Sequence, residues 1–387
     1  MSVGSDLLAD ATASVEGLPG DGLIHTSGSE IAALSPLQLF WRRFRQDRVA
    51  LISLGFIAFL ILVAIFAPLI VKLVGAPAPY ASDPSAHDQF GDPTGPSPHA
   101  LLPFFAVAIG AVLAVLSRYL PWPAIRRRAW AIIAGAGLIL AIALAIKYWP
   151  HARHIFGVDR GYRDVFSRVL YGARVSLEVA IIATGISMII GVTLGMVAGY
   201  FRGAVDMTIS RLIDTLLAFP ILLLAIGLAS ACKLGSGCVG GLIQPGLTTV
   251  IAVIAFVNWT YIARIVRGQV LSMREKEFID ASRSLGASDP RIIFREILPN
   301  LVAPIIVYAS LLIPTNVLFE ASLSYLGVGV SFPTASWGAM LSDATDIFAT
   351  AWWYMLFPGL ALLLTVLAFN LLGDGLQDAL DPRGDRS

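Results

Sequence analysis

The sequence predicts an all-α integral membrane protein. Of its 387 residues, 57% are hydrophobic and 14% are charged, and the mean hydropathy is +0.77. Soluble domains carry about a quarter charged residues, so this composition lies well outside their range. The apolar residues also gather into runs long enough to cross roughly 30 Å of hydrocarbon as helices. A net charge of +1 excludes a globally basic protein that binds nucleic acid.

The first elements are a tail, a span and an added pair of spans. Residues 1–40 contain acids but no Lys or Arg, and we expect a mobile cytoplasmic tail. The first span lies within 41–74, and the basic residues just before it place the N-terminus inside. Within 75–150 we expect an extracytoplasmic loop and two spans, at 101–116 and 129–146, because their linker is rich in arginine. Both runs are short for a span, so re-entrant helices are the alternative.

Residues 151–174 form a polar segment in which two topology signals disagree. The segment holds five arginines, Arg153, Arg160, Arg163, Arg168 and Arg174, which favour the inside, whereas the number of preceding spans places it outside. We expect it outside, as an amphipathic helix whose arginines lie among lipid headgroups.

Residues 175–374 form the core, with five further spans and a charge-dense loop at 270–300. In the first of these spans Gly191, Gly195 and Gly199 recur at every fourth position. Such a smooth stripe lets a neighbouring helix approach closely, and a gate that slides along it is the functional alternative. A cytoplasmic tail, 375–387, ends the chain. The total is eight spans, with both termini inside.

Both cysteines of the chain, Cys232 and Cys238, lie in one glycine-containing loop between spans. The span count places this loop outside, where the environment is oxidising, so we predict a disulfide, with two free thiols as the alternative. Because no histidine lies near them, we predict no metal site.

The charge-dense loop, within Glu275–Asn300, predicts two short helices with a break between them. Gly286 supplies the permissive turn, and Asp289-Pro290 pairs an N-cap with a proline at the first helical position. The second helix is expected to end or bend at Pro299. Because this helix-turn-helix lies between two spans, we interpret it as a protruding knob that docks on another protein. A solvated loop that only connects the two spans is the alternative.

Polar residues inside spans are functional candidates because their burial is costly. We single out Asn258, Asn316 and Glu320 as candidates for the substrate pathway, with hydrogen bonding between helices as the alternative. The sequence has no GxxxxGK[ST] loop, no HExxH motif and no Ser/His/Asp arrangement, so we predict no catalytic residue and no bound cofactor. An ion-coupled secondary transporter and an intramembrane enzyme are rival classes, but neither paired broken helices nor a catalytic pair within a span is apparent.

Several motifs resemble the permease subunits of ATP-binding-cassette importers. Asp280-Ala281-Ser282, Gly286 and Leu298-Pro299 match the spacing of that family's Glu-Ala-Ala loop, with Asp and Ser as departures. Further stretches are similar to the second permease of dipeptide and oligopeptide importers, a branch that also handles nickel complexes and glutathione: FGVDRGYRDVFSRVLYGARVSL, RLIDTLLAFPILLLA, FEASLSYLGVG, PTASWGAML and NLLGDGLQDALDPR. Val158 replaces the usual threonine, and the pair of spans between 101 and 146 is an insertion into a six-span core.

The resemblance implies a type I importer permease fold in the plasma (inner) membrane and a role in ATP-driven import of di- or oligopeptides. Nickel chelates and modified peptides are the alternative cargo. The implied partners are a homologous second permease, two cytoplasmic ATPase subunits that bind ATP and Mg, and an extracytoplasmic binding protein. Glu320 is the strongest candidate for contact with a peptide amino group. The residues implied to couple to the ATPase are Asp280, Ala281, Ser282, Arg283, Leu285, Gly286, Leu298 and Pro299.

Overall fold

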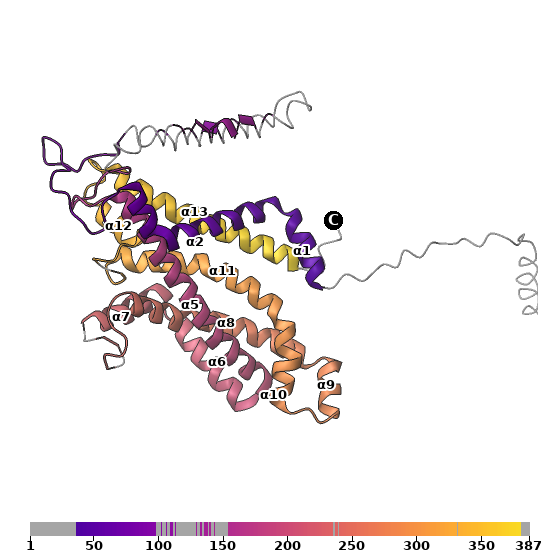
Figure 1. Cartoon of the computed structure of the whole chain (residues 1–387). Helices are drawn as coiled ribbons and strands as arrows, with labels where there is room; N and C mark the ends of the chain where they lie inside the picture. The colour runs from indigo at the N-terminus through magenta and orange to yellow at the C-terminus, as the bar shows by residue number, and fades with distance from the viewer. Residues whose placement is uncertain are drawn as a thin grey trace, which may run out of the picture.

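A computed structural model describes residues 36–97, scattered positions between 102 and 143, and residues 154–234, 237–238, 240–330 and 332–380. The described chain is helical throughout its regular elements (Figure 1). In order these are α1 (Pro36–Gln46), α2 (Arg48–Val74), α5 (Val165–Phe201), α6 (Gly203–Leu217), α7 (Ile221–Leu234), α8 (Leu247–Arg274), α9 (Glu277–Ser284), α10 (Asp289–Arg291), η3 (Ile292–Ile297), α11 (Leu298–Tyr325), α12 (Trp337–Ala344) and α13 (Trp352–Leu380).

Five described helices are long and apolar enough to cross a membrane: α2, α5, α8, the continuous run Asp289–Tyr325, and α13. α6 and α7 meet at an angle of 87° and together count as a sixth span. This is the predicted six-helix core. The predicted insertion at 101–146 lies largely outside the described residues, although Gly110 and Gly137 are both helical and face each other closely. Residues 1–35 of the predicted tail also lie outside them.

The most extensive contact between two helices of the described core joins α5 to α8 along the predicted glycine stripe. A Cβ atom at Gly191, Gly195 or Gly199 would lie 2.7 Å from an atom of α8, in each case closer than real contacts allow. The three glycines therefore let the two backbones meet almost directly. Close approach of this kind is how helices associate in lipid, where burying apolar surface gives little driving force.

The polar segment before α5 differs from the predicted interfacial helix. α5 already begins at Val165, because the Asp164 carboxylate accepts a hydrogen bond from the Ser167 N–H and caps the helix. Arg168 is buried and paired with Asp159, so its charge is neutralised within the protein rather than among headgroups. Residues 165–174 thus belong to the span.

The predicted C-terminal boundary at residue 375 is also too early, since α13 continues to Leu380. The reason is a close contact between α13 and the start of α2, where Gly375 leaves no room for a side chain beside Ala50. Ala50 lies next to Asp47, whose carboxylate caps α2 by accepting from two backbone N–H groups. α1 packs on the same region through the buried Phe44.

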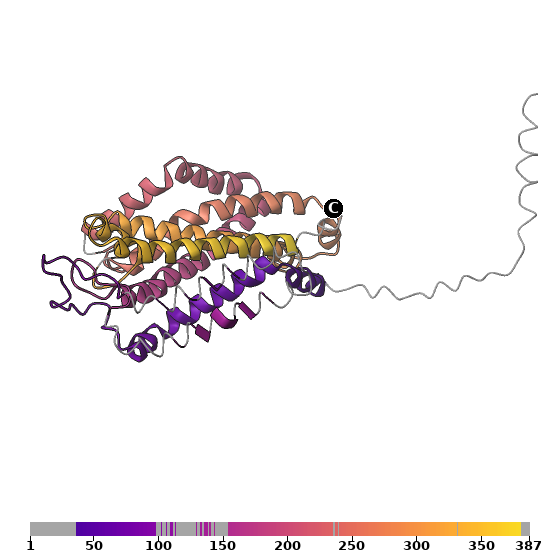
Figure 2. The ribbon, with the colours of Figure 1, turned by 90° about the horizontal axis from the view of Figure 1, so that it is seen from above.

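The bundle has two differently built ends. α12 and the irregular loop after α2 lie at one end, and α9 lies at the other (Figure 1). Viewed from above, the loop after α2 extends past the ends of the helices (Figure 2). The two ends therefore offer separate surfaces to partners.

We expect Gly195→Ala to lower the stability of the protein by about 1–3 kcal/mol, because the added methyl group must push α5 away from the Ala263 carbonyl. Gly185→Ala on the same helix is the matched control, since a Cβ there meets nothing within 4 Å. The measurement is thermal unfolding of both purified variants in one detergent. Equal destabilisation by the two substitutions would contradict the packing role of the stripe.

Candidate coupling site

The predicted break between the two short helices of the charge-dense loop falls at Gly286. α9 ends at Ser284, and Gly286 has a φ of +78°, a conformation that glycine adopts far more readily than other residues. Backbone hydrogen bonds from Gly286 N–H to Arg283 and from Ala287 N–H to Ser282 close the turn. α10 begins one residue earlier than predicted: Ser288 rather than Asp289 is the N-cap, and Pro290 is the second residue of the first turn.

The loop is anchored by isoleucines on its inner side. The buried residues are Ile279, Ile292, Ile293 and Ile297, which pack with the ends of α5 and α8. On the outer side Leu285 is 89% exposed, and Gly286, Asp280 and Ala281 are also exposed. The loop is thus a rigid knob with an apolar tip.

The second half of the loop does not end at Pro299, contrary to the prediction. Residues Ile292–Ile297 form a π-helical turn that runs directly into α11. Because the π-helical turn precedes α11 without a gap, Pro299 lies inside the continuous helical run Asp289–Tyr325, where its missing N–H leaves a carbonyl of the preceding turn without a helical donor. Leu298 is half-buried against the isoleucine cluster. The helical backbone therefore continues from the loop into α11 without a break at Pro299.

Tyr200, at the end of α5, joins this loop to the glycine-packed helix pair. Its hydroxyl donates to the Asp289 carboxylate at 2.6 Å, and its backbone carbonyl accepts from Arg274 at the end of α8. The Arg283 guanidinium lies 5.5 Å from the centre of the tyrosine ring, within cation–π range. Arg283 also lies 3.5 Å from the Asp280 carboxylate, so these two predicted residues face each other.

The predicted polar pathway residues are buried between helices. Asn258 on α8 donates to Asn316 on α11, which in turn donates to the Thr184 hydroxyl on α5 at 2.8 Å. The Glu320 carboxylate accepts from Ser176 and Ser324, each at 2.8 Å. Asn258 also lines a pocket between α8 and α11, together with Tyr261, Tyr308 and Thr315.

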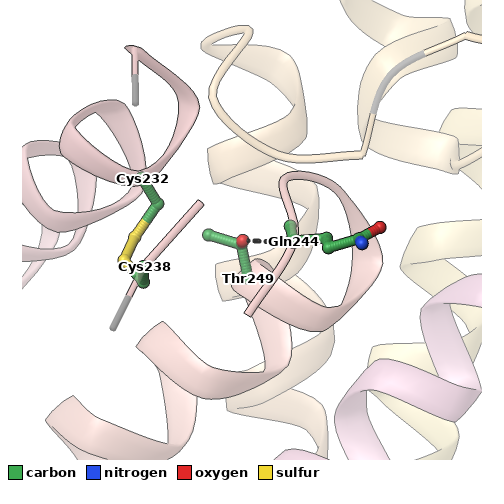
Figure 3. The surroundings of a disulfide bond; sticks show 4 residues. All are labelled: Cys232, Cys238, Gln244 and Thr249. Atoms are coloured by element: carbon green, nitrogen blue, oxygen red, sulfur yellow. Dashed lines mark hydrogen bonds between the residues drawn. A yellow bond between two sulfur atoms is a disulfide. The ribbon is translucent and has the colours of Figure 1, made fainter. Parts of the chain in front are cut away.

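The structure joins Cys232, at the end of α7, to Cys238 in the following loop by a disulfide (Figure 3). Nearby, the Thr249 hydroxyl donates to the Gln244 carbonyl at 2.7 Å and fixes the start of α8. The disulfide and this hydrogen bond hold the connection between α7 and α8.

A charged cluster at the opposite end of the bundle was missed by sequence reasoning. Buried Arg168 donates to Asp159 and, at 2.8 Å, to the Tyr354 hydroxyl, and that hydroxyl donates to Asp343 at 3.1 Å. These contacts join α5, α12 and α13 to the segment before α5. One sequence signal pointed to this cluster, namely the five arginines of residues 151–174. It did not identify their partners, because Tyr354 lies 186 residues from Arg168 in the sequence.

His154 holds the same region to the loop after α2. One ring nitrogen, Nδ1, lies 3.1 Å from the buried Asp164 carboxylate, and the other, Nε2, lies 3.5 Å from Asp83. The hydrogen bond with Asp164 raises the pKa of His154 against the opposing effect of burial, and Asp83 raises it further. Protonated His154 therefore joins two carboxylates from separate segments.

The helical core and its knob define a polytopic membrane permease. Residues 191–386 match the model of the binding-protein-dependent transport system inner membrane component, and residues 35–93 match the N-terminal TM domain of oligopeptide transport permease C. The chain belongs to the first of these families, as the permease of a binding-protein-dependent ATP-binding-cassette importer in the inner membrane. The predicted insertion lies between the two matched stretches.

Several curated relatives are similar over most of their length. The chain is 46% identical over 234 residues to the dipeptide transport system permease protein DppC of Alkalihalophilus pseudofirmus, covering 60% of this chain and 73% of the relative. It is 41% identical over 281 residues to the glutathione transport system permease protein GsiD of Escherichia coli, covering 68% and 89%. Among solved structures, the MetNI methionine ABC transporter matches at 20% identity with a TM-score of 0.47, over 56% of this chain and 97% of that one.

We expect His154→Gln to destabilise the end of the bundle that carries α12 most at mildly acidic pH, by about 1 kcal/mol. Because the folded pKa is raised, the stabilisation is fully present below the unfolded value of about 6.5 and is lost as pH rises through the folded value. The measurement is the difference in melting temperature between wild type and variant across pH. A difference that grows toward alkaline pH would contradict the assignment.

Proposed function

We propose that this chain imports peptides as one of two permeases in the importer. The observation that carries the proposal is the similarity to relatives named for dipeptide transport, which extends to 46% identity. Glutathione is a modified tripeptide, and relatives named for its transport are similar over a greater share of the chain, so modified peptides are the second candidate cargo. In this proposal Glu320, Asn316 and Asn258 line or border the path that the cargo takes.

The proposed complex contains a homologous permease, two ATPase subunits and a binding protein. ATP and Mg bind to the ATPase subunits, so this chain hydrolyses nothing. Both termini and α9 lie in the cytoplasm, and the end of the bundle that carries α12 faces outward. This orientation agrees with the basic residues that precede α2.

In the proposed mechanism the exposed tip of the loop sits in a groove of an ATPase subunit. Leu285 supplies the apolar contact, and Asp280 and Arg283 flank it with opposite charges. When ATP draws the ATPase subunits together, the loop moves as a body because its isoleucines are packed into the core. The displacement passes to α11 through the π-helical turn and to α5 through Tyr200, and the resulting rocking of helices changes access to the path.

We expect Gly286→Val to weaken binding of the ATPase subunits about tenfold, because a β-branched residue at positive φ strains the turn by about 1–2 kcal/mol. Gly286→Asn is the matched control, since asparagine tolerates this conformation. The measurement is recovery of the ATPase subunits with the tagged chain from membranes in mild detergent. If the wild-type chain transports peptide in these membranes but is recovered without ATPase subunits, the proposed function is overturned.

We expect Tyr200→Phe to leave the complex assembled but to reduce peptide transported per ATP hydrolysed. The variant keeps the ring beneath Arg283 and loses only the hydrogen bond to Asp289, worth about 1 kcal/mol or roughly a fivefold effect. The measurement is uptake and ATP hydrolysis by the same proteoliposomes. An unchanged ratio would show that α5 receives the movement by another contact.

A further inference from the structure

The loop after α2 contains a tightly built turn at His87–Pro93, here called the outer turn. Asp88 accepts hydrogen bonds from the Phe90 and Asp92 N–H groups at 2.8 and 2.9 Å. Its own N–H donates to the Asp92 carbonyl at 2.9 Å, and Gly91 has a φ of +84°. These bonds fix the backbone of the turn in one conformation.

Tyr162, in the segment before α5, contacts the outer turn through its side chain. Its hydroxyl donates to the Gly91 carbonyl at 3.1 Å, and its ring meets His87 edge to face. Tyr162 itself has a φ of +55°, which is unusual for a residue with a side chain. Backbone strain of this kind gathers at functional positions, where the surroundings hold it in place.

The tip of the outer turn is an aromatic side chain in solvent. Phe90 is 88% exposed, and the loop that carries it extends past the ends of the helices in both views (Figures 1 and 2). A large apolar side chain on a backbone ordered in advance loses little entropy when a partner buries it. Phe90 therefore has the properties of an anchor for another protein.

The charges near Phe90 indicate which kind of partner would bind there. Residues 73–117 contain no Lys or Arg, whereas the outer turn itself contains two carboxylates, Asp88 and Asp92. Anionic headgroups would be repelled by these carboxylates, while a protein surface with basic side chains around an apolar pocket would be attracted.

We propose that the outer turn captures the binding protein, with Phe90 entering an apolar pocket rimmed by basic side chains. This inference rests on the proposed function, which places this end of the bundle outside and requires a binding protein there. Asp88 and Asp92 steer the approach. The hydrogen bonds that the Asp88 carboxylate accepts and the one that the Tyr162 hydroxyl donates keep Phe90 in position.

The test uses the purified complete importer in nanodiscs and its purified, substrate-loaded binding protein. Phe90→Ala is expected to raise the binding-protein concentration that half-maximally stimulates ATP hydrolysis about tenfold, with the maximal rate unchanged. Gln89→Ala is the matched control, because Gln89 is the exposed neighbour of Phe90 in the same turn, and it should change this concentration less than twofold. Phe90→Trp should restore it.

Three outcomes separate the inference from its alternatives. If Phe90→Ala and Gln89→Ala need the same binding-protein concentration for half-maximal stimulation, the inference is overturned and the proposed function stands. If the binding protein does not stimulate ATP hydrolysis by the wild-type importer, both are overturned. A fluorophore on Gln89→Cys distinguishes lipid from protein, since both native cysteines form the disulfide. A blue shift of the fluorophore's emission on adding the binding protein supports the inference. If the emission is already shifted by the same amount in nanodiscs without the binding protein, the fluorophore contacts lipid and the inference is overturned.

Discussion

Close packing of α5 against α8 is the constraint on which the rest of the structure depends. The glycine stripe removes side chains from the contact, so the relative position of the two helices is set by their backbones. Neither helix contains a proline, whereas α2, α11 and α13 each contain at least one. Since prolines are a main cause of helix kinks, the α5–α8 pair lacks a source of bending that α2, α11 and α13 contain.

Local signals predicted much of this architecture from the sequence. Glycines at every fourth position give a helix one smooth face, and Gly286 and Pro290 have conformational preferences that few other residues share. The spans of the six-helix core followed from their long apolar runs. Each of these features depends on residues close together in the sequence, and for this reason the helical core and the turn at Gly286 could be predicted.

Contacts between distant residues could not be predicted in the same way. Tyr200 and Asp289 are 89 residues apart, and Arg168 and Tyr354 are 186 apart. The arginines before α5 were interpreted as interfacial because nothing in their neighbourhood identifies Tyr354 and Asp343 as partners. Similarly, Glu320 was predicted to meet a substrate, but its burial between two serines depends on how α5 and α11 pack.

The length of α5 explains why these distant contacts belong together. The helix has 37 residues and is therefore about 55 Å long, enough to reach past the hydrocarbon on both sides. Asp164 caps its first turn and also meets His154, while Tyr200 in its last turn meets the loop around Gly286. α5 is therefore one continuous helix that is fixed by polar contacts at both ends. In the proposed mechanism this helix connects a displacement at Tyr200 directly to Asp164 and Arg168, without a separate signal between the two ends of the bundle.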